Sequence, residues 1–165
     1  CGDKIFISKL FKDKEMEHKQ LLTVFNSLPV GIGFFTADGT LVRCNESFCR
    51  IFGADSQTLL GNKLNINENS VVPDVVKEAV RRCVPVQMSF LYDFDKQRTD
   101  KRFFSTRTRT CYLKCNGNPL YDNDGKFVNY IFIFEDITET VKSEEVLRQS
   151  RRKTELAMKL SLIHI

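Results

Sequence analysis

The chain has 165 residues, of which 42% are hydrophobic and 28% charged, with a formal net charge of +4. This balance is typical of one soluble globular domain with short extensions. Basic residues are interleaved with acidic ones, which disfavours a nucleic-acid-binding surface. No apolar run is long enough to cross a bilayer.

The first 27 residues are predicted to form a linker helix. Its apolar residues recur at spacings of three and four, which is typical of an amphipathic helix; they are Ile7, Leu10, Phe11, Leu21, Leu22 and Phe25. Pro29 disfavours helix at the residue before it, so the helix should end near Ser27. The folded domain is then expected over residues 28–138.

A tight hairpin and two short helices are predicted next. Apolar residues 32–35 and 41–42 flank the turn dipeptide Asp38-Gly39. Asn45 suits the N-cap of a helix with the sequence ESFCRIF, and Gly53 suits its C-terminal stop. Asp55 or Ser56 should start a second, shorter helix that ends at residues 60–61.

The second half of the domain is predicted to be mainly strands. Residues 72–83 form an apolar helical stripe with Pro73 in the first turn. The period then changes to two, which indicates a half-buried strand; its apolar positions are Val86, Met88, Phe90, Tyr92 and Phe94. Residues 102–120 are β-prone, Asp124-Gly125 predicts a second turn, and residues 127–134 are apolar on both faces, like a central strand. The order predicts an α+β fold with a five-stranded, mainly antiparallel sheet and short helices on one face.

The last strand runs without Gly or Pro into a charged helix predicted over residues 139–159. Asp136 can accept backbone N–H bonds at the start of this helix, Thr138 can bond to Asp136, and Glu139 can complete a capping box. Apolar residues are too sparse for a strong heptad pattern. The helix is therefore expected either to be one strand of a dimeric linker or to be a solvated helix of a monomer.

Both ends of the sequence indicate a piece of a longer protein. No signal peptide is visible, and Cys1 stands where a start Met would be, so we expect a fragment boundary there. The ending LSLIHI, residues 160–165, breaks the charged pattern and resembles the translation of a transposase adapter used in sequencing libraries. We expect it to be an artefact and the true protein to continue beyond Lys159 into a further domain.

These elements resemble a PAS domain over about residues 28–138. The resemblance is carried by GTLVRCNESFCRIFG, LLGN and NPLYDNDGKFVNYIFIFEDIT, above all by Asn45-x-x-Phe48 with Gly53 and by Asp136-Ile137-Thr138. The stretch YDFD (92–95) and the flanking helices are similar to PAS modules of bacterial hybrid sensor histidine kinases. The ending SRRKTELAMK is similar to a linker leading into another PAS unit.

The resemblance implies a cytoplasmic sensory or relay module of a two-component phosphorelay, whose parent protein could be anchored in a membrane. Its flanking helices would pair in a parallel homodimer and pass motion to a downstream PAS or kinase domain. Asp136, Thr138 and Glu139 are the expected coupling residues. The alternatives are a PAS domain of a cyclic-dinucleotide enzyme or transcription regulator, or a small-ligand-binding enzyme on an α+β scaffold.

A pocket between helices and sheet is expected from the apolar pattern. Its expected lining is Phe34, Phe48, Phe52, Met88, Phe90, Tyr92 and Leu113. These residues could bind a small organic ligand, although filling of the core by their own side chains is favoured. Tyr92 carries the polar tip of the set and is the best candidate for a specific contact.

Catalytic, metal and cofactor sites are not expected. The six cysteines form no C-x-x-C pair and lie away from histidine, so small buried hydrophobic residues in a reducing cytosol are the favoured interpretation. Haem-binding relatives use an axial His, whereas this chain has only His18 and His164. Cys83 and Met88 stay open as haem ligands. The flavin photoreceptor branch needs a reactive Cys where this chain has Leu64. His18 also lacks the neighbours of a phosphoacceptor, and no ATP-binding loop is present, so the fragment should not be an enzyme.

Overall fold

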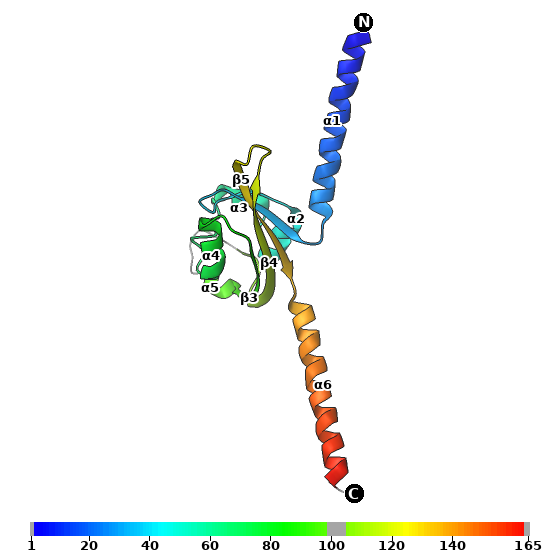
Figure 1. Cartoon of the computed structure of the whole chain (residues 1–165), viewed down its shortest axis with the longest axis vertical. Helices are drawn as coiled ribbons and strands as arrows, with labels where there is room; N and C mark the ends of the chain where they lie inside the picture. The colour runs from blue at the N-terminus through cyan, green and yellow to red at the C-terminus, as the bar shows by residue number, and fades with distance from the viewer. Residues whose placement is uncertain (1, 99–104, 164–165) are drawn as a thin grey trace.

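The computed structural model describes residues 2–98 and 105–163 and shows an elongated molecule with its two ends far apart (Figure 1). A five-stranded antiparallel sheet lies at the centre, in the order β2-β1-β5-β4-β3. The strands are β1 (Gly31–Phe35), β2 (Leu41–Cys44), β3 (Val86–Asp93), β4 (Thr110–Tyr121) and β5 (Phe127–Asp136). The helices are α1 (Gly2–Ser27), α2 (Glu46–Phe52), α3 (Ser56–Gly61), α4 (Asp74–Arg81), α5 (Phe94–Gln97) and α6 (Thr138–Ile163). The predicted α+β fold is confirmed.

The first hairpin and the helix after it form where the turn and cap residues predict. Gly39 takes a positive φ of 88° in the β1–β2 turn, a conformation that suits glycine. Asn45 caps α2, and its side-chain oxygen accepts the Phe48 N–H at 3.0 Å. Gly53 ends α2 in the left-handed region at φ 65°.

Strand β5 is the middle strand of the sheet, paired with β1 on one side and β4 on the other. Tyr130, Phe132 and Phe134 face the helices and are buried in the core. Ile131 and Ile133 alternate with them and point to the opposite face, where Ile133 is partly exposed. Residues 127–134, which are apolar on both faces, therefore belong to a central strand, as predicted.

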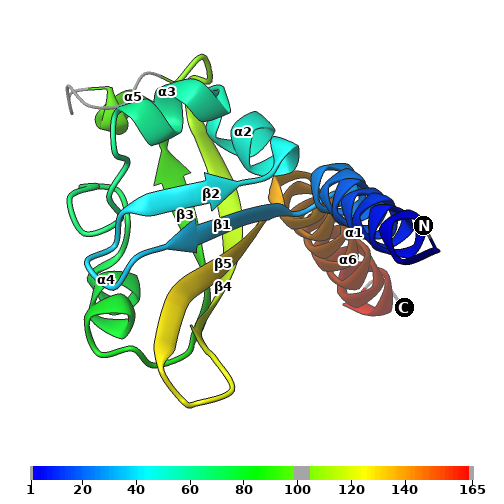
Figure 2. The same ribbon diagram turned by 90° about the horizontal axis from the view of Figure 1, so that it is seen from above.

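Helices α2 to α5 belong to the domain, whereas α1 and α6 extend away from it in opposite directions (Figure 1). Seen from above, both long helices lie on the same side of the sheet (Figure 2). Side chains of α2, α3 and α4 join those of the sheet in one hydrophobic core. Along α6 no side chain is buried. Among residues 2–98 and 105–163, no helix combines the length and the apolar character needed to cross a membrane.

Strand β3 ends one residue earlier than its alternating pattern predicts. Phe94 opens the short helix α5, because the Asp93 carboxylate accepts the backbone N–H groups of Asp95 and Lys96, both at 3.0 Å. Phe94 is fully buried, as the strand pattern predicted, although it belongs to α5. The first residues of the β-prone stretch (102–104), together with Cys1, His164 and residue 165, lie outside the described residues.

Candidate functional site

A small cavity lies between the helical layer and the sheet, where the sequence predicts a pocket. Its volume is about 30 Å³, well below the roughly 300–1,000 Å³ of pockets that bind drug-sized ligands. It is lined by Phe35, Phe48, Phe52, Leu64, Ile66, Asn69, Val72, Phe90, Tyr92 and Phe134. Apolar side chains thus fill most of the space between helices and sheet.

Four predicted lining residues, Phe48, Phe52, Phe90 and Tyr92, border this cavity, and three do not. Phe34 is the clear error, because alternation along β1 turns Phe35 towards the helices and Phe34 to the opposite face. The Phe34 ring packs 6.0 Å from the ring of Phe25 in α1.

Leu113 and Met88 are the other two corrections. Leu113 is fully buried in the same core, and Met88 is half-buried against it, but neither reaches the cavity wall. The predicted set also misses several lining residues. Phe35 and Phe134 could have been found by fixing which face of each strand meets the helices. Asn69 stands in a polar loop with no sequence signal for burial.

The polar tip of Tyr92 has a partner inside the protein. Asn69 Nδ2 donates to the Tyr92 hydroxyl at 3.0 Å, and both side chains are buried. The Asn69 side-chain oxygen accepts the Val71 N–H at 3.0 Å. This pair supplies the polar groups of an otherwise apolar cavity wall.

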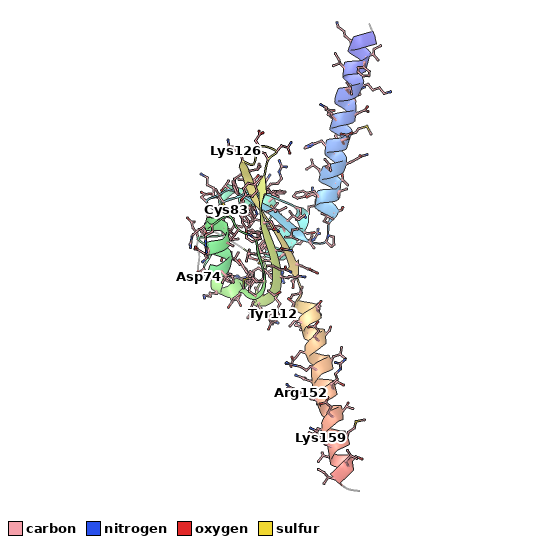
Figure 3. All side chains as sticks on the ribbon, viewed as in Figure 1. Asp74, Cys83, Tyr112, Lys126, Arg152 and Lys159 are labelled. Atoms are coloured by element: carbon pink, nitrogen blue, oxygen red, sulfur yellow. The ribbon has the colours of Figure 1, made fainter. Side chains whose placement is uncertain are left out.

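Several hydrogen bonds between neighbouring residues fix the start of α6 to the sheet. Asp136 Oδ1 accepts both the backbone N–H of Thr138, at 3.0 Å, and the Thr138 hydroxyl. The Thr138 Oγ1 accepts the Tyr112 N–H at 3.0 Å, and the Ile137 N–H donates to the Tyr112 carbonyl at 2.9 Å. Tyr112 lies beside the first turn of α6 (Figure 3). The first turn of the exit helix, which follows β5 in the chain, is therefore also hydrogen-bonded to strand β4.

Glu139 does not complete the predicted capping box. Strand β5 still includes Asp136, and α6 begins at Thr138, so Glu139 is the second helical residue and not the third that a capping box requires. Its carboxylate lies 3.9 Å from Lys142 Nζ, on an exposed surface. The bonds between Asp136 and Thr138 form, but the cap is shorter than predicted.

Arg107 joins this junction to helix α2, and no sequence pattern pointed to it. Its Nη2 lies 3.1 Å from Asp136 Oδ2, and its Nη1 donates to the Ile51 carbonyl at 2.8 Å. The guanidinium also lies 4.8 Å from the centre of the Phe94 ring, a cation–π distance. The side chain is only 33% exposed. One planar cation thus contacts α2, α5 and the start of the exit helix.

The residues just before Arg107 hold the C-terminal end of α2. The Ser105 hydroxyl donates to the Phe52 carbonyl at 2.7 Å, and the Thr106 N–H donates to the Gly53 carbonyl at 2.7 Å. The last carbonyls of a helix have no partner within it. Residues 105–107 supply those partners, so α2 and the segment before β4 form one connected unit.

The charge of Asp136 is stabilised by this arrangement. Burial is the largest single influence and acts to raise the pKa of Asp136, whereas hydrogen bonds from the Thr138 hydroxyl and amide lower it. The hydrogen bond and positive charge of Arg107 act in the same direction, and the resulting pKa lies below the usual 3.8. The carboxylate is therefore ionised at neutral pH.

Aromatic rings connect the cavity to Arg107. Phe52 lies 5.5 Å from Tyr92, and Tyr92 lies 4.9 Å from Phe94, both in edge-to-face arrangements. Phe94 is the ring beneath the Arg107 guanidinium. A continuous path of packed side chains therefore runs from the cavity wall through Arg107 to Asp136.

No histidine of the described residues lines the cavity. His18 is exposed on α1 and borders a groove with Phe25, Phe34 and Arg43 on the outer face of the sheet. Leu64, at the position of the reactive Cys of flavin photoreceptors, lines the cavity. Within the described ranges no three His, Cys, Asp or Glu side chains form a group that could hold a metal ion.

Several known structures share the fold of this chain. The PAS domain of an HTR-like protein from Haloarcula marismortui is 20% identical, with a TM-score of 0.59, and the match covers 79% of this chain and 99% of that one. A PAS domain from a two-component sensor histidine kinase is 14% identical, with a TM-score of 0.54 and coverage of 74% and 98%. An RNA-binding Light-Oxygen-Voltage receptor is 18% identical, with a TM-score of 0.60; the match covers 81% of this chain but only 37% of the receptor.

No curated protein sequence matches the chain significantly. The family described as PAS fold matches residues 25–142, which is most of the chain and includes the cavity, Arg107 and the start of α6. This chain therefore belongs to the PAS fold family.

Proposed function

We propose that this PAS domain is a sensory or relay module that passes small rearrangements of its core to the exit helix α6 through Arg107. The observation that carries the proposal is the double contact of Arg107 with the Ile51 carbonyl and with Asp136. Ile51 is in α2, the helix whose Phe48 and Phe52 line the cavity. A displacement of α2 would therefore act directly on the carboxylate that holds the first turn of α6.

Asp136, Thr138 and Arg107 would carry the coupling in this proposal, and Glu139 would contribute only to the exposed first turn of α6. Packed interfaces change between discrete arrangements more readily than they deform continuously. Loss of the Arg107–Asp136 contact would leave Thr138 bonded to Tyr112, but would separate α2 from the junction. This is the change that a relay requires.

Substitution of Arg107 in the full-length protein tests the relay. Arg107→Ala and Asp136→Ala should each abolish regulation of the output while leaving the sheet folded. The double variant should be no worse than either single one, because both remove the same contact. Arg81→Ala is the matched control, since Arg81 makes an exposed ion pair with Glu78 on α4, away from the junction. Unchanged regulation in Arg107→Ala would refute the relay.

The parent protein in this proposal is a two-component histidine kinase, and the fragment itself is not an enzyme. Support comes from the sensor-kinase PAS domain of the same fold and from the likeness of residues 92–95 and the flanking helices to such kinases. The module would lie in the cytoplasm and act on a downstream domain. Sequencing the gene beyond the codon for Lys159 tests this: a transmitter domain with a phosphoacceptor His supports it. A cyclic-dinucleotide synthesis domain or a DNA-binding domain would instead favour the alternative outputs.

We also propose that two copies pair through their flanking helices. Along α1, Ile7, Leu10, Leu21 and Val24 are exposed and occupy the core positions of two heptads, and Lys14 and Glu17 occupy the core positions of the heptad between them. A parallel partner would cover this row of apolar side chains. Light scattering of the purified chain should give the mass of a dimer, and Leu21→Glu should give that of a monomer; a monomeric parent chain would contradict the proposal.

The relay is proposed to work without haem or flavin. The cavity of about 30 Å³ supports this, because either cofactor would need the aromatic core to open. The absorbance spectrum of purified protein is the test, and a coloured preparation would overturn this part of the proposal.

A further inference from the structure

Two thiols meet at the start of helix α2. Cys44 is the last residue of β2, and Cys49 lies in the second turn of α2, with the Sγ atoms 3.8 Å apart. Both side chains are half-buried. This is the one contact between two thiols found among residues 2–98 and 105–163.

The cap of the helix explains why they meet. Asn45 is the N-cap, so Cys44 is the residue before the cap and Cys49 is the fourth helical residue. Apolar side chains at these two positions commonly pack together as a hydrophobic staple, which fixes the angle at which the chain enters the helix. Two cysteines can pack in this way, but they can also form a covalent bond.

We propose that Cys44 and Cys49 are an oxidisable pair that forms an intrachain disulfide, with a hydroperoxide as the oxidant. A disulfide needs its sulfur atoms at about 2.05 Å, so the two atoms must approach by about 1.8 Å from their present 3.8 Å. The remaining approach comes from rotation about the two Cα–Cβ bonds, together with any shift of the short segment between β2 and α2 that the bond requires. The inference does not depend on the relay through Arg107.

Other described cysteines lack such a partner. Cys111 and Cys115 share one face of β4, but four residues along a strand separate them by about 13 Å. Cys83 lies beyond the end of α4, at the end of the domain away from α2 (Figures 1 and 3). Only the pair at the start of α2 therefore has the geometry for a bond within the described chain.

The chemistry proceeds in two balanced steps. The Cys49 thiolate attacks the peroxide; an S–O bond forms, the O–O bond breaks, and the leaving hydroxide takes up the Cys49 proton as water. The Cys44 thiolate then attacks the Cys49 sulfur; the S–S bond forms, the S–O bond breaks, and a second water leaves with the Cys44 proton. Both sulfur atoms are oxidised and both peroxide oxygens are reduced.

The surroundings set the order and the rate of these steps. Burial raises the pKa of Cys44 to about 12, and the neighbouring Cys49 adds to this effect. Burial also raises the pKa of Cys49, and the charges of Asp55 and Glu46 add to this effect, whereas the hydrogen bond from Cys44 acts in the opposite direction. Cys49 is therefore the first thiolate to form. Since both pKa values are raised, oxidation should be slow at neutral pH and should accelerate as the pH rises.

The consequence concerns the attachment of α1. Between the two thiols, Asn45 Nδ2 donates to the carbonyls of Phe25 and Val30 at 2.9 and 3.0 Å. The Ser47 hydroxyl donates to the Leu28 carbonyl in the same turn. A bond from Cys44 to Cys49 would close a covalent ring around these anchors. Oxidation would thus stiffen the place where the N-terminal helix meets the domain.

Intact mass of the hydrogen-peroxide-treated protein tests the proposal. A Cys1→Ser background removes the thiol that lies outside the described residues. This protein should lose two hydrogen atoms of mass and two titratable thiols, and a non-reducing digest should give one cross-linked peptide joining residues 44 and 49. Cys44→Ser should instead accumulate oxygen adducts on Cys49. Adducts of one, two or three oxygen atoms on the background protein, with no cross-link, would overturn the proposal.

Hydrogen exchange provides the second measurement. Oxidation should slow amide exchange at residues 25–30 and 45–49 several-fold, and Cys44→Val with Cys49→Val should keep the staple but lose this response. Equal exchange before and after verified cross-linking would refute the link to α1. Arg107→Ala should oxidise normally, so failure of the relay and failure of the thiol pair can be told apart.

Discussion

Asn45 has a small side chain whose replacement should strongly destabilise the domain. Its side chain is almost fully buried and makes four hydrogen bonds. The Oδ1 atom accepts the N–H groups of Ile32 and Phe48 at 2.8 and 3.0 Å. The Nδ2 atom donates to the carbonyls of Phe25 and Val30. One amide therefore joins α1, β1 and α2.

Asn45→Ala should lower the free energy of unfolding by about 2–4 kcal/mol, with a smaller addition from the two carbonyls near α1. Loss of an N-cap costs about 1 kcal/mol, and a buried group left without a partner costs about 1–3 kcal/mol. The Ile32 N–H is such a group, because it lies in the buried strand β1 where water has little access. The two carbonyls near α1 are only partly buried and add less. The loss is a large fraction of the about 5–15 kcal/mol that stabilises a typical domain.

Urea unfolding followed by far-ultraviolet circular dichroism measures this loss. Asp55→Ala is the matched control, since Asp55 is also an N-cap but caps α3 from an exposed position. It should shift the urea midpoint far less than Asn45→Ala. If the two variants shift the midpoint equally, the buried bonds of Asn45 add nothing beyond ordinary capping, and the reasoning is refuted.

Three further predictions concern the core and the junction. Gly117→Ala should cost about 1–3 kcal/mol of stability, measured by urea unfolding, because its Cβ would lie 2.5 Å from Phe132 Cε1. Tyr92→Phe should also cost about 1–3 kcal/mol, since the buried Asn69 Nδ2 loses its acceptor; a neutral effect would mean that water replaces the hydroxyl. The pKa of Asp136 is lowered on folding, so its contribution is present above the unfolded value of 3.8 and is lost as the pH falls through the lower folded value. Asp136→Asn should therefore be less stable than the parent at neutral pH and should lose less stability on acidification, measured by urea midpoints across that range.

Local backbone chemistry made much of the fold predictable. Asp38-Gly39 and Asp124-Gly125 mark turns, and both glycines take positive φ in the structure. Asn45 and Gly53 mark the two ends of α2 because capping depends on residues close in sequence. The five-stranded antiparallel sheet follows from these punctuating residues and the strand periods between them.

The sequence predictions fail where a contact between residues far apart in the chain determines the orientation or the partner of a side chain. Phe34 and Phe35 are adjacent and equally apolar, and only the position of α2 determines which ring faces the core. Glu139 was assigned to a capping box, but β5 continues through Asp136 because it pairs with β4 there, which shifts the cap by one residue. Arg107 stands in a polar stretch, and its role depends on Ile51 and Asp136, which lie 56 and 29 positions away. No local pattern could have supplied these contacts.

Helix α2 connects the two long helices of the molecule. Its N-terminal end holds the end of α1 through Asn45 and Ser47, and its C-terminal carbonyl at Ile51 binds Arg107, which holds Asp136 at the start of α6. Coupling between two sites is reciprocal in free energy. If a change at α1 alters the population of α6 arrangements, a change at α6 must alter the attachment of α1 to the same degree. Oxidation of Cys44 and Cys49 should then change amide exchange at the first turn of α6, and Arg107→Ala should remove that distant response while leaving the local one at residues 25–30 intact.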